Sequence, residues 1–338
     1  MSPAHPSLRL GIGRRPLAAV TIAALALSAA APVGAEDAPP SIVVTTPILG
    51  SVVTRIAGDA ADILVLMPNG ADPHEWAPSA RQIGELYAAD LVVANGLGLE
   101  EGLIDALAEA EASGVPVFHA TDWIEIREGG FHADEHADEH ADEHADEHAD
   151  EHADEHAAPD DLGDDHDHAH AAGDPHFWVD PVAMHAVVDG LVATLGAQGI
   201  DVAEAGATLG AELDALDAEI AALLAPIPQE RRLLVTGHDS MGYFADRSGF
   251  RLVGAVIPGL SSQGEVSAGE LGALAEQIRT LGIDTIFTEV GTPQAVADAI
   301  AAETGAQVVA LPGPTIPADG SYLSYLREIG TIVTEALS

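Results

Sequence analysis

The chain has 338 residues, which is enough for two domains, and it carries a formal net charge of −43 and no cysteine. Such an acidic excess repels nucleic acid and anionic lipid surfaces and favours cations as binding partners. The absence of cysteine excludes disulfides and thiolate zinc sites, so a metal site in this chain must use nitrogen and oxygen ligands.

The first 35 residues have the pattern of an export signal. Arginines at positions 9, 14 and 15 precede an apolar run from Leu17 to Ala31, and the small residues up to Ala35 are typical of a cleavage site. The apolar run is shorter than the roughly 20 residues that a membrane-spanning helix needs. No cysteine follows it that could carry a lipid. We therefore expect cleavage near Ala35 and a soluble, periplasmic protein that is not lipidated.

Short apolar strands alternate with helices in the next part of the chain. Strands are expected at Ser41–Thr46, Ala61–Met67, Asp90–Ala94 and Val115–His119, and helices at Ile48–Ala57, Ser79–Ala88 and Leu103–Ala112. Strands that alternate with helices at this spacing predict a parallel sheet covered by helices. We assign residues 36–200 to an N-terminal lobe of this kind.

A histidine-rich and acidic segment interrupts this lobe at residues 131–173. It contains repeats of the tetrapeptide HADE, and it has ten histidines and seventeen acidic residues. The histidines are His132, His136, His140, His144, His148, His152, His156, His166, His168 and His170. Histidine and carboxylate are ligands for transition metals, and this composition offers almost nothing with which to build a core. We expect a disordered loop that captures metal, the alternative being a solvated acidic spacer with no metal role.

A long helix is expected after the His-rich segment. The pattern is helical from Pro181 to Leu195, and Ala203–Leu224 then combines strong helix formers with apolar residues at helical spacing. At about 1.5 Å per residue this second helix would be roughly 33 Å long, enough to run the length of a domain. We assign residues 201–227 to a linking helix and residues 228–338 to a C-terminal lobe.

The C-terminal lobe repeats the alternation of strands and helices. Strands are expected at Arg232–Thr236, Leu252–Ile257, Thr285–Thr288 and Gln307–Leu311, and helices at Ser240–Ser248, Ala268–Leu281, Pro293–Glu303 and Tyr322–Leu337. The predicted fold class is therefore α/β, with two similar lobes of parallel sheet that are joined by one long rigid helix. Such an arrangement predicts a binding site in the cleft between the lobes.

Three histidines lie in loops that follow strands, where open α/β sheets bind their ligands. They are His74, His176 and His238, and each is flanked by glycine, proline or aspartate instead of an apolar helical face. Three neutral imidazoles and one further ligand would suit tetrahedral zinc. A single loop histidine is more often a surface residue than a ligand, and we interpret His119 as structural and His185 as a helix-surface residue.

The segments around these histidines resemble the metal-binding solute-binding proteins of bacterial ABC importers, specifically the zinc group of the ZnuA and AztC types. The matching segments are PNGADPHEWAPS, the His-rich segment, DPHFWVDP, TGHDSMGYFADRSG, IPGLSSQGEVSAGEL, IFTEVGTP and SYLSYLREI. They cover nearly all of the chain from Ser41 onward. The resemblance implies that zinc is held between the lobes by His74, His176 and His238, and that it is delivered to a membrane permease driven by a cytoplasmic ATPase.

The fourth ligand is open in this sequence. Many relatives carry an aspartate shortly after the last strand, where this chain reads VVALPGPTIP and has no acid between positions 304 and 318. The candidates are Glu289, at the end of a strand of the second lobe, or a water molecule, ahead of Asp239 and Glu75. Manganese-binding relatives tend to have a carboxylate at the position of His238, and three imidazoles favour a borderline metal over Mn²⁺.

We therefore expect a monomeric zinc-binding component of a transport system, with no enzymatic activity. In this hypothesis zinc is captured first by the His-rich segment and then transferred to the three-histidine site. One alternative is a periplasmic zinc buffer or metallochaperone that works through the His-rich segment, and another is the binding component of a manganese importer. A hydrolase with an open water position on zinc is a further alternative, but the chain has no HExxH motif.

Overall fold

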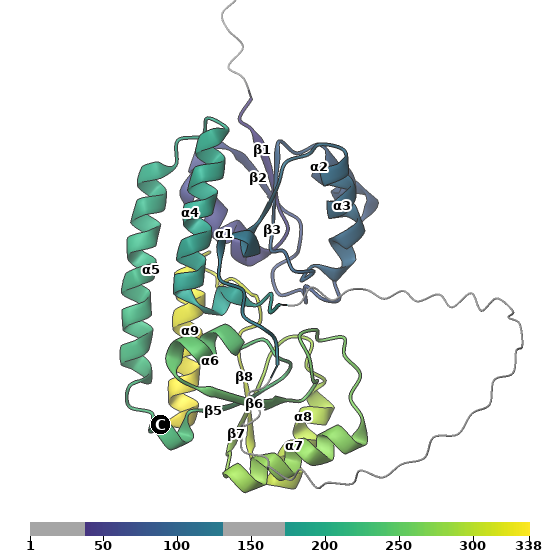
Figure 1. Ribbon diagram of the computed structural model, residues 1–338, viewed down its shortest axis with the longest axis vertical. Helices are drawn as coiled ribbons and strands as arrows, with labels where there is room; N and C mark the ends of the chain where they lie inside the picture. The colour runs from purple at the N-terminus through teal and green to yellow at the C-terminus, as the bar shows by residue number, and fades with distance from the viewer. Residues whose placement is uncertain (1–37, 131–172) are drawn as a thin grey trace, which may run out of the picture. The chain divides into compact units, whose positions relative to one another are not determined.

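The first half of the chain forms a parallel sheet with the strand order β2–β1–β3–β4 (Figure 1). The computed structural model describes residues 38–130 and 173–338. The strands are β1 (Ser41–Val44), β2 (Asp62–Val65), β3 (Leu91–Ala94) and β4 (Val117–His119). The inner strands β1 and β3 have helices packed on both faces, so their apolar side chains are buried.

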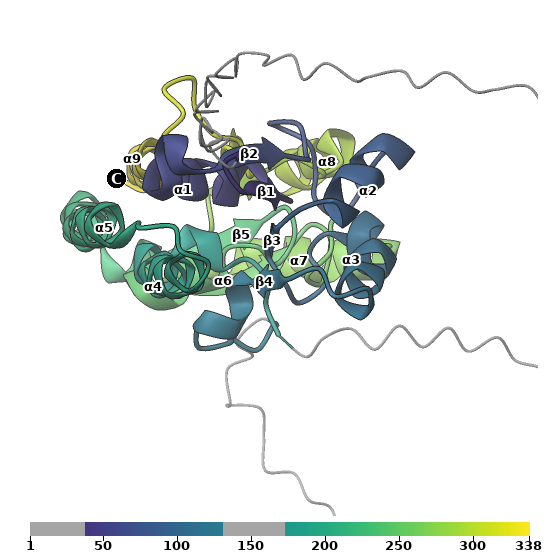
Figure 2. The ribbon, with the colours of Figure 1, turned by 90° about the horizontal axis from the view of Figure 1, so that it is seen from above.

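Helices cover both faces of this sheet. They are α1 (Pro47–Ala57), α2 (Ala80–Tyr87), α3 (Ile104–Ala112) and α4 (Pro181–Ala197). α1 and α4 share a core with Ile42 and Val44 of β1, whereas α2 and α3 share a core with Val43. Figure 2 shows these two pairs of helices on opposite sides of the strands. The division follows from the pleat of a strand, which sends successive side chains to opposite faces.

Capping residues determine where α1 and α2 begin. The hydroxyl of Thr46 accepts a hydrogen bond from the N–H of Leu49, and Pro47 occupies the first turn of α1. Ser79 and Gln82 form a reciprocal capping box at the start of α2. The cap at Ser79 also marks the end of the long loop that follows β2.

The helix α5 (Ala203–Leu224) leads the chain from the first sheet to the second half. It packs against α4, against α1 and against the last helix, α9 (Tyr322–Leu337), as Figure 1 shows for α4 and α9. Its buried leucines and isoleucine lie at positions 209, 213, 216, 220 and 224. These intervals of three and four residues place them in one stripe along the helix, which is the stripe that faces its neighbours.

The second half contains two pairs of parallel strands and the helices α6, α7 and α8, in addition to α9. The strands are β5 (Leu233–Thr236) paired with β6 (Arg251–Ala255), and β7 (Thr285–Thr288) paired with β8 (Gln307–Ala310). The helices are α6 (Gly242–Ser248), α7 (Ala268–Leu281) and α8 (Gln294–Thr304). β5 and β7 lie next to each other, so the loops that follow these two strands are neighbours as well.

Short 3₁₀ helices connect several of these elements within the described ranges. They are η1 (Gly58–Ala60), η2 (Glu101–Leu103), η3 (Ala120–Trp123), η4 (Phe177–Val179) and η5 (Gln229–Arg231). η4 comes directly after His176 and leads into α4. Among the described residues, no helix is both long enough and apolar enough to cross a membrane.

The predicted α/β fold class is confirmed, and so are the predicted elements of the described residues. The bounds of α5, α7, β7 and α9 agree with the sequence prediction to the residue, and the other elements agree within two residues. The predicted export signal and the His-rich segment lie outside the described residues, except for Gly173. The predicted limits at residues 36–200, 201–227 and 228–338 stay predictions.

Candidate metal centre

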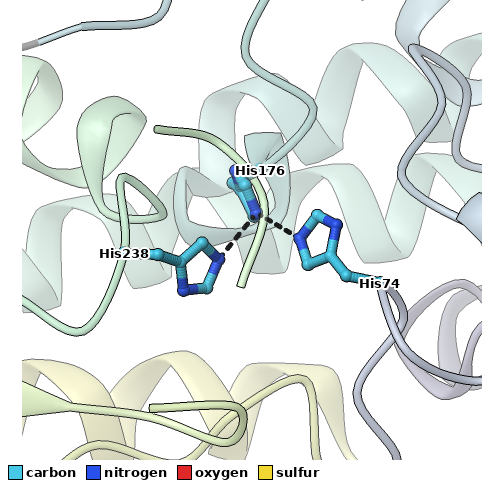
Figure 3. A group of neighbouring side chains, drawn as sticks. All are labelled: His74, His176 and His238. Carbon is cyan, nitrogen blue, oxygen red and sulfur yellow. Dashed lines mark hydrogen bonds between the residues drawn. The ribbon is translucent and has the colours of Figure 1, made fainter. Parts of the chain in front are cut away.

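Three loops bring His74, His176 and His238 into one buried cluster (Figure 3). The Nε2 atom of His176 lies 3.3 Å from Nε2 of His74 and 3.2 Å from Nε2 of His238. The exposed fractions of the three residues are 6%, 1% and 5%. Nitrogens bound to one tetrahedral zinc at about 2.0–2.1 Å are themselves about 3.3 Å apart. The two distances from His176 therefore match those of ligands on a common metal ion, and the ligand atoms of all three histidines lie within 4.8 Å of one another.

Two of these histidines are presented by the same short motif, Asp-Pro-His. Oδ1 of Asp72 accepts a hydrogen bond from the N–H of His74 at 3.0 Å, and Oδ1 of Asp174 accepts one from the N–H of His176 at 2.9 Å. A carboxylate that bonds the backbone two residues later forms a tight turn, and the intervening proline restricts φ. The motif therefore fixes the backbone of each histidine locally.

The third histidine is held by contacts between neighbouring loops. The backbone N–H of His238 donates to Oε1 of Glu289 at 3.1 Å, and its carbonyl accepts from the hydroxyl of Thr236 at 2.6 Å. Gly237 gives room for this approach, because a Cβ atom at that position would lie 1.9 Å from the hydroxyl of Thr292 and 3.1 Å from the Glu289 carboxylate. The loops after β5 and β7 thus pack directly on each other.

A carboxylate lies behind each imidazole, on the side away from the cluster. The pairs are His74 with Glu101, His176 with Asp174 and His238 with Glu289, with Nδ1-to-oxygen distances of 3.1, 2.8 and 2.7 Å. The first two are hydrogen bonds, whereas Nδ1 of His238 lies at ion-pair distance without a hydrogen bond. Such a carboxylate favours the proton on Nδ1 and leaves the lone pair of Nε2 free for a metal. All three Nε2 atoms face the centre of the cluster, as a metal site requires (Figure 3).

The pKa values of two imidazoles differ because their surroundings differ. Burial lowers the pKa of His176 to about 4, although Asp174 acts in the opposite direction. Burial also acts to lower the pKa of His238, but the Glu289 carboxylate outweighs it, so that pKa is raised. For Glu289, burial acts to raise the pKa, and the contact with His238 outweighs it and leaves the pKa lowered. His176 is therefore neutral near pH 7, whereas His238 is the imidazole that holds a proton more readily.

Arg127 faces the buried carboxylates behind the cluster. Its Nη1 lies 3.2 Å from Oδ2 of Asp174 and 3.9 Å from Oδ1 of Asp239, and its Nε donates to Asp246 at 2.9 Å. A Cβ atom on Gly242 would lie 2.3 Å from the guanidinium carbon, so only glycine leaves room for this side chain. Buried charges are tolerated only when they are paired. Arg127 therefore compensates the carboxylate that orients His176.

Glu289, the predicted fourth ligand, lies behind His238 and outside the three-histidine cluster. Its Oε1 also accepts from the hydroxyl of Ser240 at 2.9 Å, whereas its Oε2 is buried without a hydrogen-bond partner. Glu289 lines a small cavity of about 30 Å³ beside the histidines. That volume suffices for one water molecule, which needs at least about 10–15 Å³ by this measure. Glu289 and water both stay predictions for the fourth ligand.

The other residues that the sequence singled out lie away from the cluster. Oδ2 of Asp239 accepts from the N–H of Gly130 at 2.7 Å, and Glu75 is exposed. His119 pairs with a glutamate at the end of α3, and His185 pairs with an aspartate of α5, so neither contributes to the cluster. The ten histidines of the His-rich segment lie outside the described residues.

Much of the remaining lining of the cavity is apolar. Trp178, Met241, Val290, Tyr325 and Ile329 contribute to it, together with the segment Leu311–Pro314. This segment is where the sequence has no acid after the last strand, and the structure places it beside the histidines. An apolar wall lowers the local dielectric constant and strengthens the interaction between a bound cation and its ligands.

Sequence reasoning named Glu289 only as a possible ligand, and it did not find the other two carboxylates behind the imidazoles, Glu101 and Asp174. Asp174 had a local signal, the Asp-Pro-His motif that also contains Asp72. Glu101 and Arg127 had no such signal, because they are 27 and 47 residues away from the partners that they contact. Their roles depend on how the loops pack in three dimensions.

Comparisons with known proteins identify relatives of the chain. Residues 42–336 match the family described as "Zinc-uptake complex component A periplasmic". The chain is 34% identical over 339 residues to the high-affinity zinc uptake system protein ZnuA of Paracoccus denitrificans, covering 96% of this chain and 98% of that protein. It is 27% identical over 294 residues to the manganese-binding lipoprotein MntA of Halalkalibacterium halodurans, covering 82% and 83%.

The fold is also similar to a solved structure, the periplasmic zinc-binding protein TroA from Treponema pallidum. The TM-score is 0.69 at 23% sequence identity, and the match covers 88% of this chain and 99% of that chain. At this level of identity the likeness concerns the fold alone. It supports the two-lobe α/β architecture that the sequence predicts.

The carboxylate behind His176 gives a first test of the metal centre. Asp174→Asn is expected to lower zinc affinity by about 10- to 100-fold, because the amide no longer raises the basicity of the imidazole or selects its tautomer. Chelator competition measures the affinity. The matched control is Asp214→Asn, which removes the carboxylate from His185 at the same 2.8 Å distance but away from the cluster. An equal effect of both substitutions, or none, would contradict the assignment.

Proposed function

The chain belongs to the family of periplasmic zinc-uptake components, and from this premise we propose that it binds Zn²⁺ at His74, His176 and His238 and delivers it to an ABC permease. The observation that carries the proposal is the convergence of three buried Nε2 atoms at 3.2 and 3.3 Å. Members of the family are metal-binding components of ABC-type uptake systems and not enzymes, so the prediction of a transport component without enzymatic activity is confirmed.

The choice of zinc rests on the ligand set. Imidazole nitrogen suits zinc and other borderline metals, whereas Mn²⁺ prefers carboxylate and carbonyl oxygen. The carboxylates near the cluster face the Nδ1 side of the imidazoles, where they support the histidines and do not displace them. Relatives include a protein named as manganese-binding, so the metal has to be tested directly.

The fourth ligand in this proposal is either water or Oε2 of Glu289. A water would occupy the small cavity beside the histidines, within reach of the unpaired carboxylate oxygen. The apolar segment Leu311–Pro314, which also lines the cavity, offers no side-chain ligand. A site with three protein ligands and one exchangeable position would hold zinc firmly and still allow another ligand to enter during transfer.

The remaining parts of the transport cycle follow from the proposed role. Zinc is captured outside the cytoplasmic membrane by a monomer whose export signal has been removed near Ala35. The loaded protein then docks on an inner-membrane permease, and the ATPase of that permease drives the import. The histidines of the residue range 132–170 act as tethered weak ligands that raise the local zinc concentration near the tight site.

The zinc stoichiometry of two variants tests where the tight site lies. One tight zinc per chain should survive deletion of residues 132–170, because His74, His176 and His238 lie outside that range. The same site should vanish in His238→Ala. Chelator competition on the mature protein and on both variants gives the number of sites and their affinities.

A surface histidine provides the control for this experiment. His185→Ala removes an imidazole that pairs with Asp214 away from the cluster, and it should leave tight binding unchanged. Loss of tight binding on deletion of residues 132–170 would make the protein a zinc buffer. Loading at low zinc should be slower in the shortened chain, and an unchanged rate would remove the capture role of the His-rich segment.

Zinc affinity should rise with pH through the raised pKa of His238. The metal needs the neutral imidazole, so a proton on His238 competes with zinc below that pKa and no longer competes above it. His176 adds no pH dependence near neutrality, since its pKa lies at about 4. Glu289→Gln should shift the midpoint of this rise in zinc affinity to lower pH, because it removes the carboxylate that raises the pKa of His238. Chelator competition across a pH series measures this midpoint, and an unmoved midpoint would contradict the role given to Glu289.

Growth at low zinc tests delivery to a permease. Deletion of the gene should prevent growth in chelator-treated medium, and added zinc should restore it. A copy that encodes His238→Ala should fail to complement, whereas His185→Ala should complement. Normal growth of the deletion strain at limiting zinc, with zinc binding intact in the purified protein, would favour a buffer over an importer component.

A further inference from the structure

We propose that Ser261 and Ser262, on the loop after β6, position His74 from the opposite half of the chain and thereby slow the release of the metal. The proposal rests on the metal site described above and names the contacts that keep it closed. His74 comes from the loop after β2 in the first half, whereas the two serines belong to the second half. The serines bond the carboxylates of Asp72 and Glu101, which hold His74, and these bonds have to break before the two halves can separate at the metal.

The buried member of this pair of contacts is Ser262. Its hydroxyl donates to Oδ2 of Asp72 at 2.6 Å, while Oδ1 of the same carboxylate accepts the backbone N–H of His74 at 3.0 Å. The exposed fractions of Asp72 and Ser262 are 7% and 5%. One carboxylate therefore connects the backbone of a ligand histidine to the opposite half of the chain.

The second contact reaches the imidazole ring itself. The hydroxyl of Ser261 donates to Oε1 of Glu101 at 2.6 Å, and the same oxygen lies 3.1 Å from Nδ1 of His74. The Glu101 side chain is 39% exposed, so water screens this contact more than the one at Asp72. Both the backbone and the ring of His74 are thus held by carboxylates that the serine loop contacts.

Tight packing keeps water away from the buried contact. Gly291 has a φ of +89°, and a Cβ atom there would lie 2.2 Å from Oδ2 of Asp72 and 2.8 Å from Cβ of Ser262. A glycine is needed both for the backbone conformation and for this close approach. Loss of the Ser262 hydroxyl would leave a buried carboxylate oxygen without its donor, which is unfavourable for the closed arrangement.

The supports of the other two histidines are arranged differently. Asp174 is two residues from His176, and Glu289 belongs to the same half of the chain as His238. Separation of the halves at the serine loop would therefore leave these two pairs in place, whereas the carboxylates that hold His74 would lose their serine donors. The position of His74 is thus coupled to the closure of the two halves.

The rate of zinc dissociation tests this coupling. Ser262→Ala should accelerate dissociation on the order of tenfold, which is typical for the loss of one hydrogen bond to a buried charged group. Ser261→Ala should have a smaller effect because its contact is partly exposed, and the double variant should exceed either. Dissociation is measured by stopped-flow transfer of zinc from the full mature protein to an excess of chelator.

The chain offers a matched control in Ser324. Its hydroxyl donates to Oδ2 of Asp319 at the same 2.6 Å, but this contact lies within one segment at the start of α9. Ser324→Ala should leave the dissociation rate unchanged. Ser262→Thr keeps the hydroxyl and should restore slow release. The unfolding temperatures of the metal-free variants should not correlate with their zinc dissociation rates.

Three outcomes would overturn the proposal. They are an unchanged dissociation rate in Ser262→Ala, an equal acceleration in Ser324→Ala, and fast release in Ser262→Thr despite its hydroxyl. If the unsubstituted protein bound no zinc at the three histidines, the proposed function itself would fail. The two failures are therefore told apart by the zinc stoichiometry of the unsubstituted protein.

Discussion

Three imidazoles that face one another in a buried space constrain the rest of this structure. Each Nε2 must keep a free lone pair, so each Nδ1 needs a partner behind it, and all three partners are carboxylates. Buried carboxylates in turn need compensation, which Arg127 supplies for Asp174. The imidazoles of the site thus depend on the carboxylates behind them, and the carboxylate of Asp174 depends in turn on Arg127. A bound metal would complete it at the centre, where three lone pairs converge.

The α/β architecture brings the three histidines of the cluster together. Strands of five residues or fewer end close to one another in each half, and the loops that leave them carry His74 and His238. His176 comes from the segment before α4, and its Asp-Pro-His motif is set by local hydrogen bonds and by contacts from Arg127 and Tyr243. The stripe of α5 that packs on α4 and α9 joins the two halves into one core. The metal site lies where these rigid parts meet, so small movements between the halves act on it directly.

Much of this could be predicted from the sequence, and the limits have a physical cause. α5, α7 and α9 were predicted to the residue because periodicity and caps, such as the capping box at Ser267, are local signals. The three histidines were predicted from the loop-forming residues beside them. The partners Glu101, Arg127 and Ser262 were not predicted, because each contacts the site from far along the chain. Glu289 was predicted to be near the metal from its place at a strand end, but its oxygen faces Nδ1 of His238.

A transport component has to bind its cargo tightly and also give it up, and these demands conflict in a rigid site. In this structure the three histidines are held by different kinds of contact. His176 is fixed by Asp174 two residues before it, and His238 by Glu289 on a neighbouring loop of the same half. His74 depends on Asp72, which is bonded to Ser262 of the other half. Because His74 and His176 lie in the first half and His238 in the second, movement between the halves separates one ligand from the other two. A metal ion held by two imidazoles binds far more weakly than one held by three, so a modest opening is enough to change retention into release.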